Sequence, residues 1–297
     1  MDSLTRYTQV AARSAAVVIS RYSTSFGLAC RLLPPGARCD IENVYALVRV
    51  ADEAVDGAAA AAGLDPAAVG EQLDRLEQET AAALRTGYST NLVVHAFAGS
   101  ARRAGIGMDL VEPFFASMRA DLTVAEHSAE SLGAYIYGSA EVVGLMCLRV
   151  FQTLPGAVQG RDAELAAAAR SLGAAFQKVN FLRDLAADTQ ELGRTYFSDA
   201  GPADFDEARK RRLVADIRAD LAAAAPGIGL LAPGARRAVG LAHGLFSALA
   251  DRIEQVPAAE LLTSRVRVGG PGKARVALRV LARPEPAARS GLQGAAR

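Results

Sequence analysis

The chain has 297 residues, of which 51% are hydrophobic and 6% aromatic, and it contains no Trp. Its 33 basic and 32 acidic residues give a formal net charge of +1, so no excess of positive charge indicates binding to nucleic acid. Three Cys and three His residues are too few and too scattered for a disulfide framework or a zinc site. The length suits one large domain with a sizeable core.

Helical periodicity prevails along the chain, and hairpin signals are lacking. Clusters of Pro and Gly separate the periodic segments and predict helices at roughly 5–21, 38–57, 66–86, 89–105, 109–121, 129–154, 161–190, 204–224, 232–254 and 271–282. From about Arg283 onward, Pro, Ala, Gly and Arg replace the periodic pattern. We therefore expect one all-α domain over residues 1–282 and a disordered tail over 283–297.

The first residues lack the apolar segment of a signal peptide. The longest apolar run, around Val142–Val150, is too short to cross a bilayer and contains Arg149. We expect a water-soluble, cytoplasmic protein. Peripheral contact with the inner face of the membrane stays open as a hypothesis, with the basic residues of 265–279 as the best candidate surface.

Polar residues form a stripe on the predicted helix 38–57. Tyr45, Arg49, Asp52 and Asp56 follow one another at i, i+4, i+7 and i+11, which places them on one face, with Glu53 alongside. Like charges four residues apart are mildly unfavourable in an isolated helix. Such spacing is nevertheless common on solvated faces, so this motif by itself is weak evidence for a site.

A second stripe lies on the predicted helix 161–190, where Gln177, Asn180, Asp184 and Asp188 fall at i, i+3, i+7 and i+11. Amide and carboxylate oxygens are costly to bury in an Ala- and Leu-rich helix without compensation. A hard cation such as Mg²⁺ would supply it. Two carboxylate pairs on facing helices could hold several Mg²⁺ ions, and through them a diphosphate. Gln177 could instead be an amide that packs between helices.

At these residues the chain resembles the squalene/phytoene synthase family, and among its members most of all bacterial phytoene synthases. The resemblance extends in order through nearly the whole chain, over the segments 22–26, 33–34, 45–56, 135–144, 177–188, 193–196 and 265–268, and Lys273. It implies the all-α fold of the class I isoprenoid synthases, a single-domain helical bundle around a central cavity lined by the two Asp motifs.

The resemblance also implies roles for individual residues. Mg²⁺, for which Mn²⁺ can substitute, would be bound by Asp52, Asp56, Asp184 and Asp188, with Glu53 and Asn180 as helpers. Arg49 and Tyr45 would join these aspartates at the reacting end. Substrate contacts are expected from Ser23, Ser25, Phe26, Arg49, Tyr135, Gln177, Asn180, Arg183, Arg194, Tyr196, Arg265 and Lys273. By residue type alone, Ser23 and Ser25 would more often be cap or loop residues.

The reaction that the resemblance implies is the head-to-head joining of two geranylgeranyl diphosphates to phytoene. It proceeds through a cyclopropyl intermediate, prephytoene diphosphate, releases diphosphate and needs no NADPH. The alternatives are a squalene or presqualene diphosphate synthase, a class I terpene synthase that acts on one prenyl diphosphate, and a catalytically silent protein that binds prenyl lipids. The motifs leave open the substrate chain length, C15 or C20, and the oligomeric state. No obligate protein partner is inferred.

An apolar tunnel should shelter the carbocations from water. Its expected wall comprises Phe26, Tyr45, Tyr135, Val142, Val143, Gly144, Leu145 and Leu172, and Gly138 and Gly144 are expected to leave room for a long chain. The chain departs from the common family pattern at four positions. Glu141 replaces a Gly and is expected to point outward or to pair with an Arg; the other three are Glu53 for Asp, Phe246 for Tyr and Ser198 for Pro.

Overall fold

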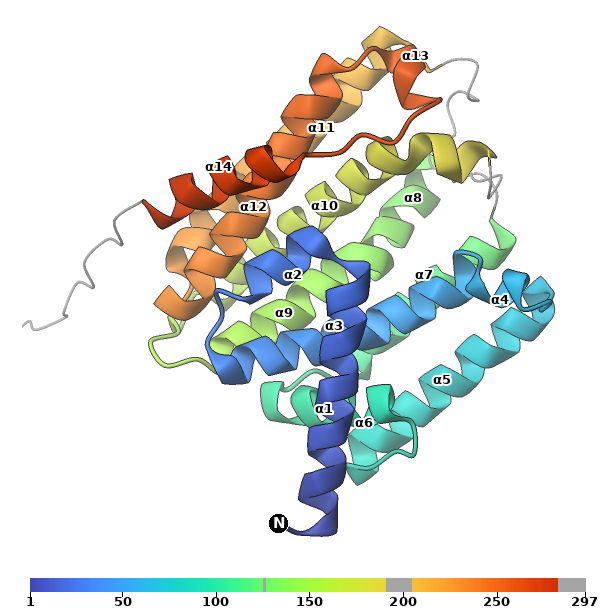
Figure 1. Ribbon diagram of the computed structural model, residues 1–297, viewed down its shortest axis with the longest axis vertical. Coiled ribbons are helices and arrows are strands. Elements are labelled where there is room, and N and C mark those ends of the chain that lie inside the picture. The colour runs from blue at the N-terminus through green and yellow to red at the C-terminus, as the bar shows by residue number, and fades with distance from the viewer. Residues whose placement is uncertain (125–126, 191–204, 283–297) are drawn as a thin grey trace, which may run out of the picture.

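The structure is a computed structural model that describes residues 1–124, 127–190 and 205–282. Over these residues the regular elements are helices and no strand occurs (Figure 1). In chain order they are α1 (Ser3–Tyr22), α2 (Thr24–Cys30), α3 (Pro35–Val55), α4 (Ala58–Ala61), α5 (Pro66–Thr86), α6 (Leu92–Ala104), α7 (Met108–Thr123), α8 (Ala129–Ile136), the π-helical turn η1 (Tyr137–Glu141), α9 (Val142–Gln152), α10 (Asp162–Gln190), α11 (Glu207–Leu230), α12 (Pro233–Gln255), α13 (Ala258–Leu261) and α14 (Gly270–Leu281). The expected tail 283–297 lies outside the described residues.

Local sequence signals explain several helix ends. The Asp65 side chain accepts a hydrogen bond from the backbone N–H of Ala68 at the start of α5, and Pro66 occupies the first helical position. Gly87 ends the helix at φ 79°, a left-handed conformation that favours glycine. The prediction of a helix over 66–86 is therefore confirmed at both ends.

Other boundaries differ from the prediction because tertiary packing overrides the local signal. Helix α11 continues through Pro226 to Leu230, beyond the break expected after residue 224. A Cβ on Gly227 would lie 2.3 Å from the Cβ of Ala168, so this glycine lets α11 pack closely on α10. The short helices α2, α4 and α13 were not predicted, and the expected helix 129–154 divides into α8, η1 and α9.

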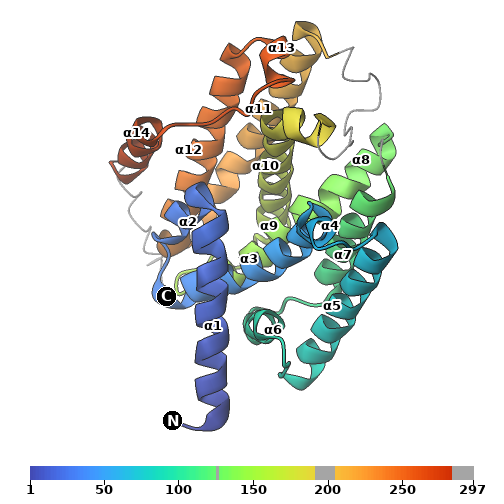
Figure 2. The same ribbon diagram turned by 45° about the vertical axis from the view of Figure 1, so that its right-hand side comes forward.

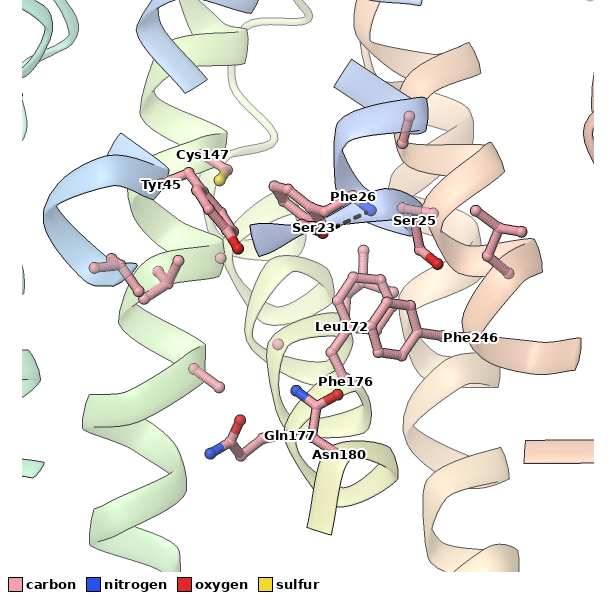
Figure 3. Close-up of a pocket in the computed structure, with 18 of the residues that line it drawn as sticks. Ser23, Ser25, Phe26, Tyr45, Cys147, Leu172, Phe176, Gln177, Asn180 and Phe246 are labelled. Carbon is pink, nitrogen blue, oxygen red and sulfur yellow. Dashed lines mark hydrogen bonds between the residues drawn. The ribbon is translucent and has the colours of Figure 1, made fainter. Parts of the chain in front are cut away.

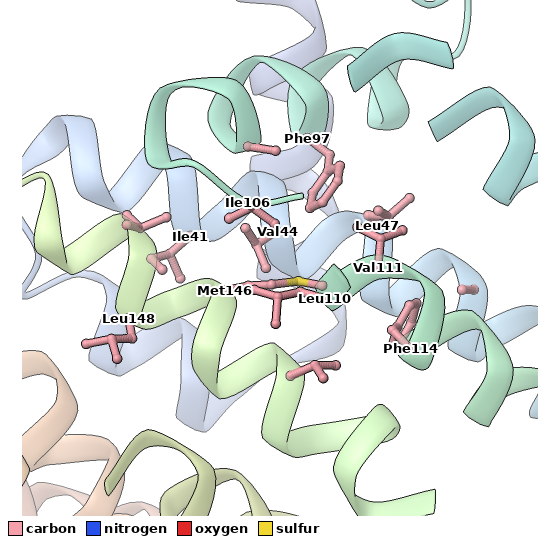
Figure 4. Close-up of a cluster of buried hydrophobic side chains, with 14 of the residues drawn as sticks. Ile41, Val44, Leu47, Phe97, Ile106, Leu110, Val111, Phe114, Met146 and Leu148 are labelled. Carbon is pink, nitrogen blue, oxygen red and sulfur yellow. The ribbon is translucent and has the colours of Figure 1, made fainter. Parts of the chain in front are cut away.

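The helices lie in two groups with α3, α9 and α10 between them. Helices α5, α6 and α7 lie to one side, and α11, α12 and α14 lie to the other (Figures 1 and 2). One hydrophobic core joins α3, α6, α7 and α9 and includes Val44, Phe97, Phe114 and Met146 (Figure 4). A second core joins α10, α11 and α12 around Leu182, Ile217 and Ile253.

Two glycines that were expected to leave room for a substrate chain both serve helix packing. A Cβ on Gly138 would lie 2.2 Å from the carbonyl oxygen of Pro113 on α7. A Cβ on Gly144 would lie 2.5 Å from the carbonyl oxygen of Ala169 on α10. Since both contacts are with backbone, the glycines allow η1 and α9 to approach their neighbours. Gly138 does not line the cavity of this fold, so the expectation was wrong for it, whereas Gly144 does line the cavity.

The continuous run Glu130–Gln152, formed by α8, η1 and α9, is long and apolar enough by length and composition to cross a membrane, and 33% of its most apolar window is buried. This run contacts α3, α7 and α10 within the bundle. A core helix of a water-soluble protein passes the same test, so length and composition are weak evidence for a span.

Candidate active site

A cavity of about 870 Å³ lies between the two cores and extends along α10. Helix α10 lines it with residues spaced three or four apart, which form one continuous face: Leu165, Ala168, Ala169, Leu172, Gly173, Phe176, Gln177, Asn180, Phe181, Arg183 and Asp184. Up to Phe176 this face is apolar, and from Gln177 onward it is mostly polar. The cavity therefore has an apolar end and a polar end.

Helix α3 brings the first acidic motif to the polar end. Tyr45, Arg49, Asp52 and Asp56 all line the cavity, so the predicted stripe faces it. Glu53 does not line it and forms an ion pair with Arg49. A nitrogen of Arg49 also lies 3.1 Å from a carboxylate oxygen of Asp52. These acidic groups lie in the last turn of α3, where the helix dipole already adds partial negative charge, so the local field favours a cation.

Helix α10 brings the second acidic motif to the same end. The carboxylate of Asp184 accepts a hydrogen bond of 2.9 Å from Nε of Arg183, and its Oδ1 lies 2.7 Å from Nε of Arg265. Arg265 comes from the segment between α13 and α14, far away in sequence. Asp188 lies one turn further along α10, and its side chain is outside the described residues.

Helices α2 and α14 complete the polar end. The hydroxyl of Ser23 accepts a hydrogen bond of 3.1 Å from the backbone N–H of Phe26, so Ser23 caps α2 while it lines the cavity. The ammonium group of Lys273, in α14, donates to the hydroxyl of Thr24 at 2.8 Å. Ser25 lines the cavity as well. The two helices thus place a cation and three hydroxyls beside the acidic motifs.

Aromatic side chains line the middle of the cavity (Figure 3). The rings of Phe26 and Tyr45 stack with centroids 5.9 Å apart, and those of Phe176 and Phe246 stack at 3.7 Å. Phe246, at the position where the resemblance leads one to expect a Tyr, therefore contributes to the cavity wall. Burial raises the pKa of Tyr45, which keeps its phenol neutral at neutral pH.

Tyr135 lines the cavity from α8. Its hydroxyl donates to a carboxylate oxygen of Asp121, on α7, at 3.0 Å, and its ring lies near that of Phe181. Asp121 also lines the cavity. This pair fixes the orientation of the phenol at the cavity wall.

Two thiols belong to the cavity wall, Cys30 on α2 and Cys147 on α9. Burial raises the pKa of each to about 12, so both are protonated and uncharged at neutral pH. Of the expected wall residues, Val142 and Leu145 do not line the cavity, and Val142 is fully buried in the first core. The expectation was wrong for these two because consecutive residues of a helix point about 100° apart, so the four residues 142–145 cannot all face one cavity.

The donor groups at the polar end fit a hard cation. The amide oxygen of Asn180 is buried and has no hydrogen-bond partner among the described residues. It lies on the same helix face as Asp184, and carboxylate and amide oxygens are the ligands that Mg²⁺ prefers. No three His, Cys, Asp or Glu side chains of the described chain converge on one point. The two motifs instead offer separate carboxylates, each accompanied by arginine.

Some cavity residues were missed by the sequence analysis. The guanidinium of Arg49 lies 4.7 Å from the ring centroid of Tyr22, a cation–π contact that no spacing indicated. The apolar face of α10 could have been found by continuing the Gln177 stripe backward in steps of four, through Gly173 and Ala169 to Leu165. Arg194, Tyr196 and Ser198 lie outside the described residues.

The sequence pattern of the squalene/phytoene synthase family matches residues 19–271. The chain belongs to this family. Within it, the chain is similar to the 15-cis-phytoene synthase of Paracoccus sp. (strain N81106 / MBIC 01143), at 35% identity over 60% of this chain and 57% of the relative. It is also similar to the 4,4'-diapophytoene synthase of Staphylococcus haemolyticus (strain JCSC1435), at 26% identity over 64% of this chain and 62% of the relative. The matches thus span about three fifths of these relatives.

Solved structures show the fold of this family member. A dehydrosqualene synthase in complex with a ligand superposes with a TM-score of 0.77 at 20% identity, covering 94% of this chain and 98% of that one. Squalene synthase HpnC from Alicyclobacillus acidocaldarius superposes with a TM-score of 0.69 at 19% identity. This match covers 86% of this chain and 96% of that one. The expected isoprenoid-synthase fold is confirmed. Proteins of this class generally depend on divalent metal ions.

One departure from the family pattern behaves as expected. A carboxylate oxygen of Glu141 lies 2.6 Å from Nε of Arg170, and Glu141 does not line the cavity. The charge is therefore neutralised away from the site, and this prediction is confirmed.

Proposed function

We propose that the chain is a phytoene synthase, which joins two geranylgeranyl diphosphates head to head and releases diphosphate. The observation that carries the proposal is one cavity with an acidic, arginine-flanked end and an apolar end. A prenyl diphosphate has the same division, with a charged head and a hydrocarbon chain. Membership of the squalene/phytoene synthase family supports the same reaction type.

In this proposal Asp52, Asp56, Asp184 and Asp188 hold Mg²⁺, with Asn180 as a helper. Glu53, which was expected to help as well, does not line the cavity and instead pairs with Arg49. Bound Mg²⁺ neutralises the charge that develops on a departing diphosphate. The carboxylates of Asp52 and Asp184 form ion pairs with Arg49, Arg183 and Arg265, so each lies next to a cationic group that can also contact a phosphate.

The cationic side chains hold the diphosphate. Arg49, Arg183 and Arg265 carry planar guanidinium groups whose N–H donors match phosphate oxygens, and Lys273 adds a point charge beside Ser23 and Ser25. With Mg²⁺ bound to the carboxylates, these N–H donors would be available to the phosphate oxygens. Gln177 and Tyr135 orient the prenyl chain near the head group. By the family resemblance, Arg194 and Tyr196 contact the substrate and close the site beside the second acidic motif.

The apolar wall protects reactive carbocations. Phe26, Tyr45 and the stacked Phe176–Phe246 pair exclude water next to the polar end. The thiols of Cys30 and Cys147 are uncharged, so neither presents a thiolate that would capture a cation. Loss of a proton then gives the triene, and no reductant such as NADPH enters this proposal.

The C20 substrate is favoured over the C15 substrate by the relatives. The phytoene synthase is 35% identical and the diapophytoene synthase is 26% identical over similar shares of this chain. The C15 reaction is the second candidate, because the dehydrosqualene synthase covers 94% of the chain at a TM-score of 0.77.

The test is a product assay. The purified chain is incubated with Mg²⁺ and either geranylgeranyl or farnesyl diphosphate, with and without NADPH, and the extract is analysed by mass spectrometry. We expect a C40 triene without NADPH. A C30 product or a cyclic C20 hydrocarbon would overturn the assignment. If neither substrate released diphosphate, the result would indicate a protein that binds prenyl lipids without catalysis.

The product is a hydrocarbon and must leave toward lipid, so we also propose transient contact with the inner face of the membrane. Helix α14 presents Leu278, whose relative exposure is 69%, beside Arg275 and Arg279. An apolar side chain between cations suits an anionic lipid surface. Sedimentation with anionic liposomes should deplete the chain, and Leu278→Asp should weaken this depletion; an unchanged supernatant would contradict the contact.

A further inference from the structure

Four apolar side chains close the end of the cavity that lies farthest from the acidic motifs. Leu148 and Phe151 come from α9, Leu165 from the first turn of α10, and Leu231 from the residue after α11. All four are buried, with relative exposures of 4% to 8%. Three helix ends therefore meet at this point. We call these four side chains the end wall.

The end wall separates the large cavity from a second, small one. The same four residues line both cavities, and the small one is bounded on its other side by Gln152, Ala157 and Val158. Its volume is about 10 Å³, which is room for about one water molecule. A chain in the large cavity must therefore stop at the end wall.

Helix α10 gives a ruler for the length of chain that fits. Leu165 precedes Asn180 by fifteen residues, which at 1.5 Å per residue corresponds to about 22 Å. An isoprene unit adds four carbon–carbon bonds to an extended chain, or about 5 Å. A C20 chain then spans roughly 20 Å, a C15 chain roughly 15 Å and a C25 chain roughly 25 Å. The C20 chain is therefore the longest that fits within this length, the C15 chain ends a further isoprene unit from the end wall, and the C25 chain exceeds the length.

We propose that the end wall sets the maximum chain length at C20 for at least one of the two substrates, with Phe151 as its main element. This inference rests on the proposed function, because it assumes that the diphosphate lies at the polar end. Phe151 has the largest of the four side chains, and its removal would join the large cavity to the small one. The geometry thus assigns substrate specificity to residues that touch no charged group.

The test uses unreactive prenyl thiolodiphosphates of C15, C20 and C25, whose binding with Mg²⁺ is measured by calorimetry, together with turnover of the matching diphosphates. For the unaltered chain we expect C20 to bind at least tenfold more tightly than C15 and C25. Phe151→Ala should improve C25 binding at least tenfold relative to C20. Leu231→Phe adds bulk to the wall and should shift the preference toward C15.

Two controls keep the outcome interpretable. Phe115→Ala makes the same change at a fully buried position that lines neither cavity, and it should leave the ratios unchanged. Phe151→Leu shortens the side chain with less loss of packing, and it replaces the Ala variant if that variant does not fold. An unchanged ratio of C25 to C20 in both Phe151 variants would overturn the proposal. Binding that follows the predicted lengths without any turnover would instead count against the proposed function alone.

Discussion

The cavity face of α10 has two halves with opposite chemistry. From Leu165 to Phe176 it is apolar and contributes Leu165 to the end wall and Phe176 to the stacked aromatic pair, and from Gln177 to Asp184 it carries amide, guanidinium and carboxylate groups. Both halves have the same helical spacing and face the same cavity. The apolar half contributes to folding by burial. The polar half concentrates groups that gain little from packing, and the buried amide oxygen of Asn180 is left without a partner.

This difference predicts that the two halves respond differently to substitution. Changes in the polar half should remove turnover and leave stability nearly intact. Changes in the apolar half should lower stability or alter the accepted chain length. Four substitutions or measurements test this division, in order of decreasing expected effect.

The largest effect is expected in the polar half, from Asp184→Asn, and from Asp52→Asn on α3. Each should lower turnover by about 1,000-fold or more, because a neutral amide binds Mg²⁺ more weakly and supports less charge on the leaving group. Stability should change by about 1 kcal/mol or less, since these ion pairs are partly exposed. Diphosphate release and thermal unfolding are the measurements.

The matched control is Asp216→Asn, on α11, which pairs with Lys178 and does not line the cavity. Its turnover should stay near that of the unaltered chain. Near-normal turnover in Asp52→Asn or Asp184→Asn would refute the metal assignment.

Gly173→Ala tests the apolar half. A Cβ at this position would lie 2.5 Å from the carbonyl oxygen of Ala140 and 3.0 Å from Cα of Glu141, so α10 and η1 must move apart. We expect a loss of about 1–3 kcal/mol in the free energy of unfolding. Chemical denaturation measures this loss. The same change at Gly229, an exposed helical position with open space around it, should stabilise by about 0.5–1 kcal/mol. Equal effects at the two positions would contradict close packing at Gly173.

Arg265→Gln tests whether the segment between α13 and α14 contributes to substrate binding at the polar end. Its side chain is half exposed and reaches Asp184, so its removal should cost little stability. We expect the KM for the prenyl diphosphate to rise about tenfold with a smaller change in kcat, as for the loss of one charge-assisted contact to phosphate. Steady-state kinetics would disprove this role if KM did not change.

The smallest effect concerns thiol reactivity. Burial raises the pKa of Cys30 and Cys147 to about 12 and also raises that of the half-buried Cys39, though less. Because the thiolate is the reactive form, a maleimide at pH 8 should label Cys39 at least tenfold faster than the other two. Peptide mapping by mass spectrometry gives the rates. Equally fast labelling of Cys147 would mean that the cavity wall is open to water.

Much of this division could be predicted from the sequence because it follows helical spacing. The stripes from Tyr45 to Asp56 and from Gln177 to Asp184 face one cavity, as their periodicity indicated. The caps at Asp65 and Gly87 fixed the ends of α5 in the same local way. The family assignment rested on the two polar stripes and the segments that accompany them, and it is confirmed by the match over residues 19–271.

The rest depends on contacts that local sequence does not encode. Lys273 meets Thr24 across 249 residues, and no periodicity relates the two. Gly138 and Gly144 showed that small residues were needed, but only the crossing of η1 and α9 with their neighbours shows what they accommodate. Pro226 signals a break that close packing at Gly227 overrides. Likewise, the end wall is built from three helix ends that meet only in the folded chain.

The most direct test of the central claim is a crystal structure of the chain with Mn²⁺ and geranylgeranyl thiolodiphosphate. Anomalous scattering locates the metal, and electron density locates the prenyl chain of the ligand. We expect metal between the motifs that contain Asp52 and Asp184, the diphosphate against Arg49 and Arg265, and the C20 chain directed along α10 toward Phe151. Metal bound elsewhere, or a prenyl chain that extends away from Phe151, would contradict the proposed site.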